Sequence, residues 1–250
     1  MAHYSKMKQK FNRKPLFVLL WCIAGVFSIS AIQSCGKAGG ASPNGLNIEY
    51  EIFNLSPNLG GINLYIRFNP VNTTPYIFNN APAYFFVPYT DTPYQFRQAI
   101  STSTALGSGP TLFSRPDILT TNTKYSLFVF GTYNSSSFQQ ILTVDTATPP
   151  ALGRGKVRFV NVSPTGTTGL DLYANGTKLF SAQGYPVVSK YMEIPVGYYD
   201  FQVETTGTSN VLQDIPAYNI QDGRLYTIYA HGYSNRTDSA IFAAGVIINK

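Results

Sequence analysis

The residues of this chain that could perform acid–base chemistry are few and widely spaced. His231 is the only histidine after residue 35, and it stands at the end of a predicted strand. A catalytic histidine needs an orienting partner and a nucleophile, and no serine stands in the Gly-x-Ser-x-Gly elbow of hydrolases. Glu49 and Glu51 share one face of a strand, but solvation of a strand start explains them equally well. We therefore expect no enzyme, no catalytic residue, no cofactor and no metal, and a hydrolase is the least favoured reading.

Cys35 is the residue to which the sequence gives a defined chemical role. Five basic residues and no acid lie in residues 1–14, residues 16–32 carry no charge, and the sequence Ile-Gln-Ser-Cys then ends at Cys35. This order is typical of a secretory signal. Its end resembles a bacterial lipobox, in which cleavage between Ser34 and Cys35 precedes lipid attachment to the Cys35 thiol. The alternative is an uncleaved anchor, because seventeen apolar residues could just span a bilayer.

Charge and cysteine content exclude two further classes of protein. The chain has 18 Lys and Arg against 12 Asp and Glu, but five of the basic residues precede Cys35, which leaves 13 against 12. A nucleic-acid surface needs a clustered basic patch, so nucleic-acid binding is rejected. The second cysteine, Cys22, lies in the apolar segment, so the folded part has no thiol for redox chemistry or for a thiolate metal site.

The clearest structural signal lies in residues 156–180. Apolar Val157 and Phe159 alternate with their neighbours at the two-residue period of a strand. Asn175-Gly176 then separates two further alternating runs. Because a type I′ turn needs positive φ at both central residues, this pair predicts a β-hairpin.

A diverged copy of this segment lies upstream. Asn-Leu-Ser-Pro from Asn54 corresponds to Asn-Val-Ser-Pro from Asn161, and a late strand ending at Gly131 corresponds to one ending at Gly232. The offsets are 107 and 101 residues, so distant positions keep almost the same spacing. A period this long indicates tandem domains, because solenoid repeats are about 20–50 residues long.

These residues resemble a known family. Val-Arg-Phe-Val-Asn-Val-Ser-Pro over 157–164, Leu-Asp-Leu-Tyr-Ala-Asn-Gly over 170–176 and Ile-Pro-Val-Gly-Tyr-Tyr over 194–199 are similar to the bacterial domain of unknown function 4397. The first copy lacks the Asn-Gly hairpin, and Val87-Pro88 stands as the remnant of its Pro-x-Gly turn. The resemblance implies β-sandwich modules, often carried by lipoproteins, without an established activity.

The predicted fold is all-β, with two tandem antiparallel β-sandwich domains of immunoglobulin-like or transthyretin-like type after a signal peptide and flexible tether. The predicted segments are a signal peptide at 1–34, a lipidated cysteine and tether at 35–45, modules at 46–148 and 155–250, and a linker at 149–154. We expect strands at 48–54, 62–68, 83–87, 94–99, 125–132, 139–144, 157–162, 170–174, 177–180, 189–194, 199–205, 225–232 and 239–247, with short helical turns at 115–119 and 211–218.

Aromatic residues are unusually frequent, with 18 Tyr and 17 Phe. Most suit strands and cross-strand pairs, but tyrosines near loops can form a contact surface for sugars or proteins. Tyr198, Tyr199 and Tyr89, together with residues 84–86, are the candidates. Asp-Thr-Ala at Thr146 and Asp-Ser-Ala at Ser239 resemble the acceptor for envelope O-glycosylation in Bacteroidota.

The sequence therefore predicts a lipid-anchored envelope protein with a non-catalytic binding or structural role. A glycan-binding accessory lipoprotein of a nutrient-uptake system is the alternative, and the predicted partners are the membrane and a glycan or envelope protein. Surface-exported lipoproteins in Bacteroidota often carry acids just after the cysteine, whereas residues 36–40 carry none. This favours the periplasmic leaflet of the outer membrane over the cell surface.

Overall fold

A computed structural model describes residues 45, 47–80, 83–88, 93–102, 105–116, 119–165 and 168–249. The predicted signal peptide, Ser34, Cys35 and Tyr89 lie outside these residues. The described residues form strands and turns without a helix, which confirms the all-β prediction. None of them belongs to a helix long and apolar enough to cross a membrane.

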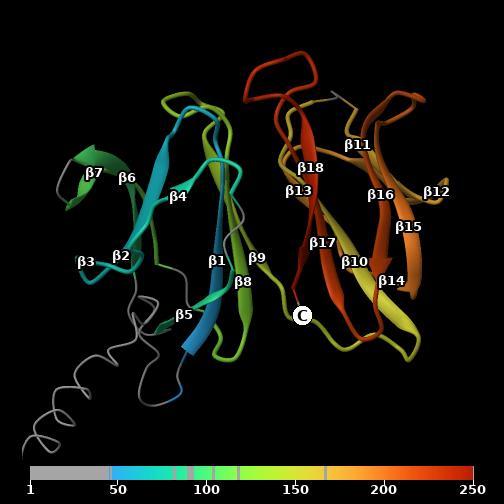
Figure 1. Cartoon of the computed structure of the whole chain (residues 1–250), viewed down its shortest axis with the longest axis horizontal. Coiled ribbons are helices and arrows are strands. Elements are labelled where there is room, and N and C mark those ends of the chain that lie inside the picture. Colours follow the sequence, from blue (N-terminus) through green and yellow to red (C-terminus); the bar gives the residue numbers. More distant parts are fainter. Residues whose placement is uncertain are drawn as a thin grey trace, which may run out of the picture. The chain divides into compact units, whose positions relative to one another are not determined.

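The first nine strands form one sandwich-like body (Figure 1). They are β1 (Asn47–Leu55), β2 (Gly61–Ile66), β3 (Asn69–Pro70), β4 (Tyr76–Ile77), β5 (Phe85–Pro88), β6 (Tyr94–Thr102), β7 (Ala105–Arg115), β8 (Lys124–Phe130) and β9 (Gln139–Val144). One sheet has the order β5-β1-β8-β9, and the other has the order β3-β2-β6-β7 with β4 also paired to β2. We call this body module 1.

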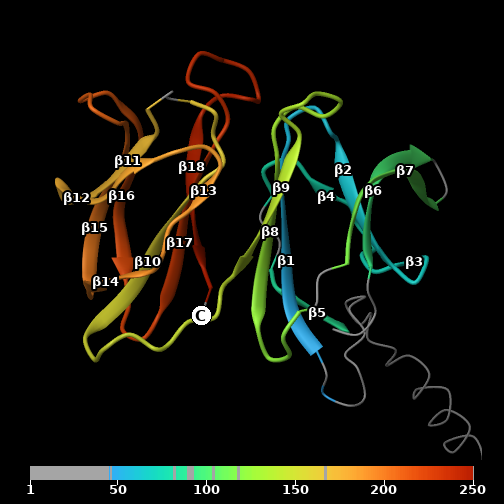
Figure 2. The same cartoon turned by 180° about the vertical axis from the view of Figure 1, so that it is seen from behind.

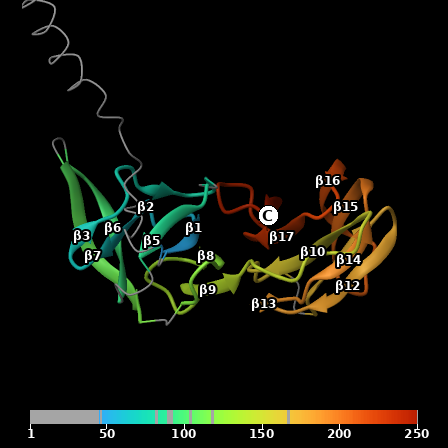
Figure 3. The same ribbon diagram turned by 90° about the horizontal axis from the view of Figure 1, so that it is seen from below.

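The remaining strands form a second body, module 2 (Figure 2). They are β10 (Arg154–Asn161), β11 (Leu170–Ala174), β12 (Thr177–Gln183), β13 (Val187–Val188), β14 (Met192–Pro195), β15 (Gly197–Thr205), β16 (Val211–Ile220), β17 (Leu225–His231) and β18 (Ala243–Ile248). One sheet has the order β13-β10-β17-β18 with β14 also on β10, and the other has the order β12-β11-β15-β16. The layering within each module is visible in Figure 3.

Each module has its own core between its two sheets. In module 1, Tyr50 and Ile52 of β1 pack with Leu64 of β2 and Phe96 of β6. In module 2, Val157 and Phe159 of β10 occupy the equivalent place and pack with Leu172 of β11 and Phe201 of β15. The alternation in the sequence therefore marked the face of β10 that lines the core.

The other face of β1 and of β10 is buried as well. Phe53 and Leu55 of β1 belong to a third apolar cluster together with Val160 of β10 and Val162, which follows it. A strand with one face in water alternates between buried and exposed residues, whereas a strand covered on both sides does not. The near-continuous burial of β1 and β10 thus results from contact between residues of the two modules.

The sheets are mixed, which corrects the expectation of purely antiparallel sandwiches. β1 pairs with β8 in parallel, and β10 pairs with β17 in parallel, while the other pairs of named strands are antiparallel among the described residues. Parallel neighbours need a long crossover. Here all the named strands of the second sheet of each module lie between them in the chain. Alternation of side chains does not encode strand direction, so the sequence could not show this.

Three local predictions differ from the structure. Residues 211–218 belong to β16 rather than to a helical turn, because Pro216 and the positive φ of Ala217 are accommodated on an edge strand beside a register shift. Arg115 ends β7 instead of beginning a helical turn, while residues 117 and 118 of that expected turn lie outside the described residues. The sequence does not predict β7, because its glycines and proline have low strand propensity. The strand expected over 189–194 is present only in part, because β13 ends at Val188 and β14 begins at Met192.

The first copy has no Asn-Gly pair, yet it forms a hairpin turn of the same kind at Arg67 and Phe68. Asn175 and Gly176 have φ of 48° and 73°, as the predicted type I′ turn requires, and they join β11 to β12. Arg67 and Phe68 join β2 to β3 with φ of 49° and 67°. Module 1 therefore makes the same turn with two residues that carry large side chains. Left-handed backbone costs such residues about 1–2 kcal/mol each.

Candidate functional site

A group of ionisable side chains is buried where β10 of module 2 meets β9 of module 1. Arg158 forms an ion pair with Asp145, which directly follows β9, and both side chains are almost completely buried. The Arg158 guanidinium also donates hydrogen bonds to the carbonyl oxygen of Val144 at 2.8 Å and to Thr143 Oγ1 at 3.0 Å. Its Nε donates to Thr227 Oγ1 of β17 at 2.8 Å. Arg158 thus links the two sheets that face each other across the contact, β5-β1-β8-β9 of module 1 and β13-β10-β17-β18 of module 2.

Glu51 of β1 lies beside this ion pair and is 4% exposed. Ser126 Oγ lies 3.3 Å from Glu51 Oε2 and 2.5 Å from Asp145 Oδ2. Burial, followed by the charge of Asp145, raises the pKa of Glu51 to about 8. Ser126 has a single hydroxyl proton, so a protonated Glu51 can donate to Ser126 while Ser126 donates to Asp145. At neutral pH the group therefore carries one negative and one positive charge.

The buried group is built from two corresponding sets of four residues. In module 1 they are Glu51, Tyr84, Ser126 and Asp145, and in module 2 they are Arg158, Tyr191, Thr227 and Asn249, at offsets of 101 to 107 residues.

The internal hydrogen bonds of the two sets correspond. Tyr84 OH donates to Asp145 Oδ2 at 2.7 Å. In module 2, Tyr191 OH and Thr227 Oγ1 donate to Asn249 Oδ1 at 3.3 and 2.6 Å. Burial raises the pKa of Tyr84, so its hydroxyl keeps its proton.

The two sets differ in charge. Module 1 supplies two carboxyl groups, whereas module 2 supplies a guanidinium and an amide. Besides the ion pair, Asn249 Nδ2 donates to Tyr84 OH at 2.9 Å across the contact. Two copies of the module 1 set would bring four carboxyl groups together, and two copies of the module 2 set would bring two guanidinium groups together. The divergence therefore favours the pairing of module 1 with module 2.

The apolar part of the contact also has corresponding halves. The His231 ring lies parallel to Tyr229 at a centroid distance of 6.0 Å and meets Phe78 edge to face at 6.2 Å. At the corresponding place, Phe130 meets Tyr185 edge to face at 5.8 Å. Burial lowers the pKa of His231 to about 4, so its imidazole is neutral at neutral pH.

The histidine and glutamate singled out in the sequence are therefore not surface groups. His231 and Glu51 are buried at the contact, whereas Glu49 is partly exposed and forms an ion pair with Lys124 at 3.0 Å. In the described part of the chain, no three His, Cys, Asp or Glu side chains are grouped so that they could hold a metal ion. Asp145 and Arg158 are not recognisable as a pair from the sequence, in which the only signal is a charged residue inside the alternating run of β10.

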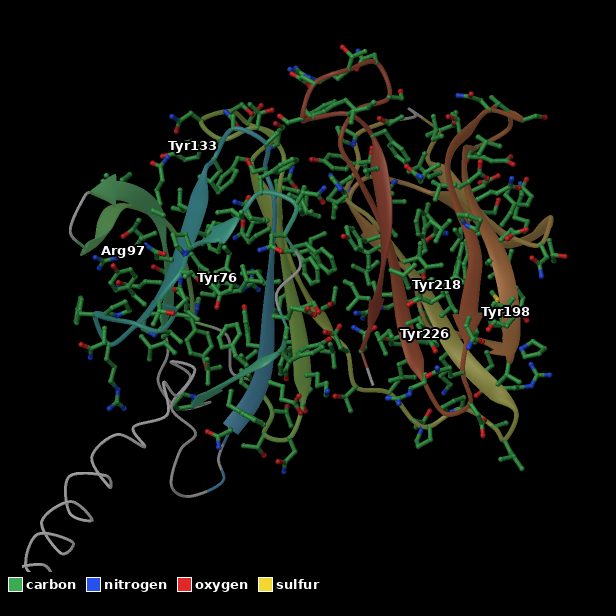
Figure 4. The ribbon with its side chains drawn as sticks, in the orientation of Figure 1. Tyr76, Arg97, Tyr133, Tyr198, Tyr218 and Tyr226 are labelled. Carbon is green, nitrogen blue, oxygen red and sulfur yellow. The ribbon has the colours of Figure 1, made fainter. Side chains whose placement is uncertain are left out.

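Two of the three tyrosines predicted as ligand contacts, Tyr198 and Tyr199, lie in the described residues. Tyr198 of β15 is 70% exposed (Figure 4). The neighbouring Tyr199 points to the opposite face, as successive strand residues do, and its ring stacks on Phe201 at 5.7 Å. Tyr84 belongs to the buried group described above. Among the described residues, Tyr198 thus faces away from Tyr199 and does not belong to the buried group that contains Tyr84.

Both proposed O-glycosylation residues are exposed. Thr146 Oγ1 accepts a hydrogen bond from the Lys124 backbone N–H at 3.0 Å and lines a pocket of about 240 Å³ that also borders Asp145 and Asn249. Ser239 lies between β17 and β18, next to Asp238. Accessibility is compatible with modification, which stays a prediction.

Comparison with known families decides the classification. The profile of the domain of unknown function DUF4397 matches residues 50–168 and 165–244. The chain belongs to the DUF4397 family. Two DUF4397 matches in tandem confirm the duplication predicted from Asn54 and Asn161. Both asparagines are fully buried, and each accepts a hydrogen bond through its side-chain oxygen from the backbone N–H two residues later. No curated protein matches the chain.

Proposed function

We propose that this DUF4397 protein is a non-catalytic component of the cell envelope, in which two modules act together as one binding or structural body. The supporting observation is that ionisable side chains are buried at the contact between the modules. Glu51, Asp145, Arg158 and His231 are all buried where the modules meet. Because a substrate must reach the groups that act on it, residues used to join the modules are poorly placed for catalysis.

The finer fold assignment within this proposal is immunoglobulin-like. Tyr125 OH accepts a hydrogen bond from the Thr120 backbone N–H at 2.9 Å, and Tyr226 OH accepts one from Gln221 N–H at 2.9 Å. A tyrosine near the start of a strand that bonds to the backbone a few residues upstream is a tyrosine corner, which is a hallmark of immunoglobulin-like sandwiches. Its presence in both modules favours this type over the transthyretin-like alternative.

Attachment through Cys35 completes the proposal and defines its test. Cells are grown with radiolabelled palmitate, and protease is then added to intact and to permeabilised cells, with detection through module 2. We expect label on the wild-type protein and none on Cys35→Ala, with digestion only after permeabilisation if the protein lies in the periplasmic leaflet of the outer membrane. Label that persists in Cys35→Ala would rule out the lipoprotein assignment. Digestion on intact cells would instead place the protein on the surface.

A glycan-binding accessory role in a nutrient-uptake system is the second candidate, and the exposure of Tyr198 is the observation that favours it. Exposed tyrosines can provide flat contact area for sugars. In affinity electrophoresis, a polysaccharide that retards the wild-type protein should lose this effect on Tyr198→Ala but not on Tyr199→Phe, since the half-buried Tyr199 ring packs on its own module. Equal retardation of both variants would dismiss Tyr198 as a contact. Turnover of any substrate that is lost in a folded His231→Gln variant would contradict the non-catalytic proposal itself.

A further inference from the structure

The β12-β11-β15-β16 sheet of module 2 contains a buried carboxylate that is paired with a cation of the same sheet. Asp171 of β11 forms an ion pair with Lys178 of β12. The same carboxylate accepts hydrogen bonds from the Ala182 N–H at 2.7 Å and from Thr206 Oγ1 at 2.6 Å. The Lys178 ammonium lies over the Tyr173 ring at 5.2 Å from its centre. Every partner that this carboxylate needs is thus supplied by module 2 itself.

Module 1 has a related arrangement without the carboxylate, in which the cation comes from the neighbouring strand on the other side. Ile62-Asn63-Leu64-Tyr65 corresponds to Leu-Asp-Leu-Tyr around Asp171, so Asn63 stands at the aspartate position. Arg97 of β6 is the direct cross-strand partner of Asn63, and its guanidinium lies over the Tyr65 ring at 4.6 Å. A cation over a tyrosine therefore remains, but the negative charge beside it has become a neutral amide.

The exchange leaves two hydrogen-bond donors without acceptors. Asn63 is 1% exposed, and neither its Nδ2 nor Arg97 Nε has a partner, although both atoms are buried. Arg97 Nη2 donates to Gln95 Oε1 at 2.9 Å, and no carboxylate of the described residues lies within ion-pairing distance of Arg97. A buried donor without an acceptor costs free energy. The site therefore lacks one oxygen acceptor, and a charged oxygen would form the stronger hydrogen bonds.

Gln95 connects this site to an open pocket. It lines a cavity of about 230 Å³ together with Arg67, Phe68 and Pro93. Phe68 is 78% exposed and stands in the strained turn described above, where module 2 has Gly176. Strained residues with an exposed large side chain are grounds for a functional hypothesis. In Figure 4, Arg97 lies on the β6–β7 side of module 1, away from β1.

We propose that module 1 binds a carboxylated sugar of the uronic acid type at this site. The carboxylate takes the place of the Gln95 amide on Arg97 and provides the missing acceptor for Asn63, as Asp171 does within module 2. The sugar ring occupies the pocket against Phe68. The volume is below the range of about 300–1,000 Å³ typical of ligand pockets, which suits a single ring. The proposal adds a ligand class to the binding role proposed above and depends on neither Tyr198 nor the lipid anchor.

The test is a titration followed by NMR of the side-chain N–H signals of the ¹⁵N-labelled protein. We expect sodium glucuronate to shift the Arg97 Nε–H and Asn63 amide signals in a saturable manner, while glucose, which has the ring without the charge, does not. N-acetylglycine, which has a carboxylate without the ring, should bind at least tenfold more weakly. Tyr198→Ala should leave the titration unchanged.

Two variants decide the outcome. Asn63→Asp restores the internal carboxylate of module 2, so it should abolish the glucuronate response and raise the melting temperature. Arg97→Gln removes the cation and should abolish the response without raising the melting temperature. If Asn63→Asp does not fold, Arg97→Gln alone still tests the site. Glucuronate binding that persists in either folded variant, or an equal response to glucose, overturns the site. N-acetylglycine binding as tightly as glucuronate overturns the sugar as ligand and points to a peptide carboxylate.

Discussion

Replacing Glu51 with Gln should remove a large part of the pH dependence of stability. The pKa of Glu51 is about 8 in the folded protein against an ordinary value of 4.5. Between these values the folded state holds a proton that the unfolded chain has released. The free energy of unfolding therefore falls by about 1.4 kcal/mol per pH unit as the pH rises. The stabilisation is complete below the unfolded pKa and is lost as the pH passes through the folded one. From pH 5 to pH 9 the loss is about 4 kcal/mol.

Glutamine keeps the size and neutrality of the protonated side chain, and its amide can donate to Ser126 as that side chain does. Urea unfolding of wild type and Glu51→Gln at intervals from pH 5 to pH 9 gives the two profiles. At pH 9 the variant should have a higher free energy of unfolding than the wild type. This difference between the two proteins should become about 4 kcal/mol smaller as the pH is lowered to 5. Glu49→Gln is the matched control, because it removes a partly exposed carboxylate of the same strand face that lies outside the buried group. Parallel profiles for wild type and Glu51→Gln would refute the assignment of a buried, protonated Glu51.

Three further outcomes follow from the contact between the modules and from the turn at Phe68. Asp145→Asn should lower the free energy of unfolding by about 3–5 kcal/mol, measured by urea unfolding at pH 7, because it leaves the Arg158 charge buried and unpaired; a loss below 1 kcal/mol would mean that water reaches the guanidinium. Burial lowers the pKa of His231 from 6.5 to about 4, so the folded protein resists protonation of this ring. The free energy of unfolding should therefore fall by about 3 kcal/mol as the pH drops from above 6.5 through 4. His231→Phe, which copies Phe130 of the other half, should remove this loss in acid unfolding curves, and an unchanged acid limb would contradict it. Phe68→Gly should raise stability by about 1 kcal/mol in thermal unfolding, since glycine adopts positive φ without strain; a lower melting temperature would show that the ring contributes packing.

Short-range features of the fold could be predicted from the sequence. The Asn175-Gly176 hairpin is present, because its turn geometry depends on two neighbouring residues. The remnant Val87-Pro88 is also in place, since Pro88 lies opposite Asn47 in β1 as Pro195 lies opposite Arg154 in β10. Both features depend on residues that are neighbours in the chain, so a single sequence is enough to predict them.

Features that depend on distant parts of the chain could not be predicted in the same way. The parallel pairing of β1 with β8 depends on the path of the whole intervening sheet. The turn at Arg67-Phe68 has lost the residues that would reveal it, and the surrounding strands impose its geometry. A polar residue in an alternating strand normally faces water, so the sequence predicts a solvated Glu51. Only the second module, which covers that face, reverses the interpretation.

The central claim is that the two DUF4397 modules act as one body joined through the ion pair of Arg158 and Asp145 and the aromatic contacts around His231. Residual dipolar couplings of the backbone amides in a weakly aligned sample at pH 6 test this most directly. One alignment tensor should fit residues 47–144 and 154–249 together in the wild type, and separate tensors should be needed for Asp145→Asn. Two different tensors in the wild-type protein would show modules that reorient independently and would contradict the account.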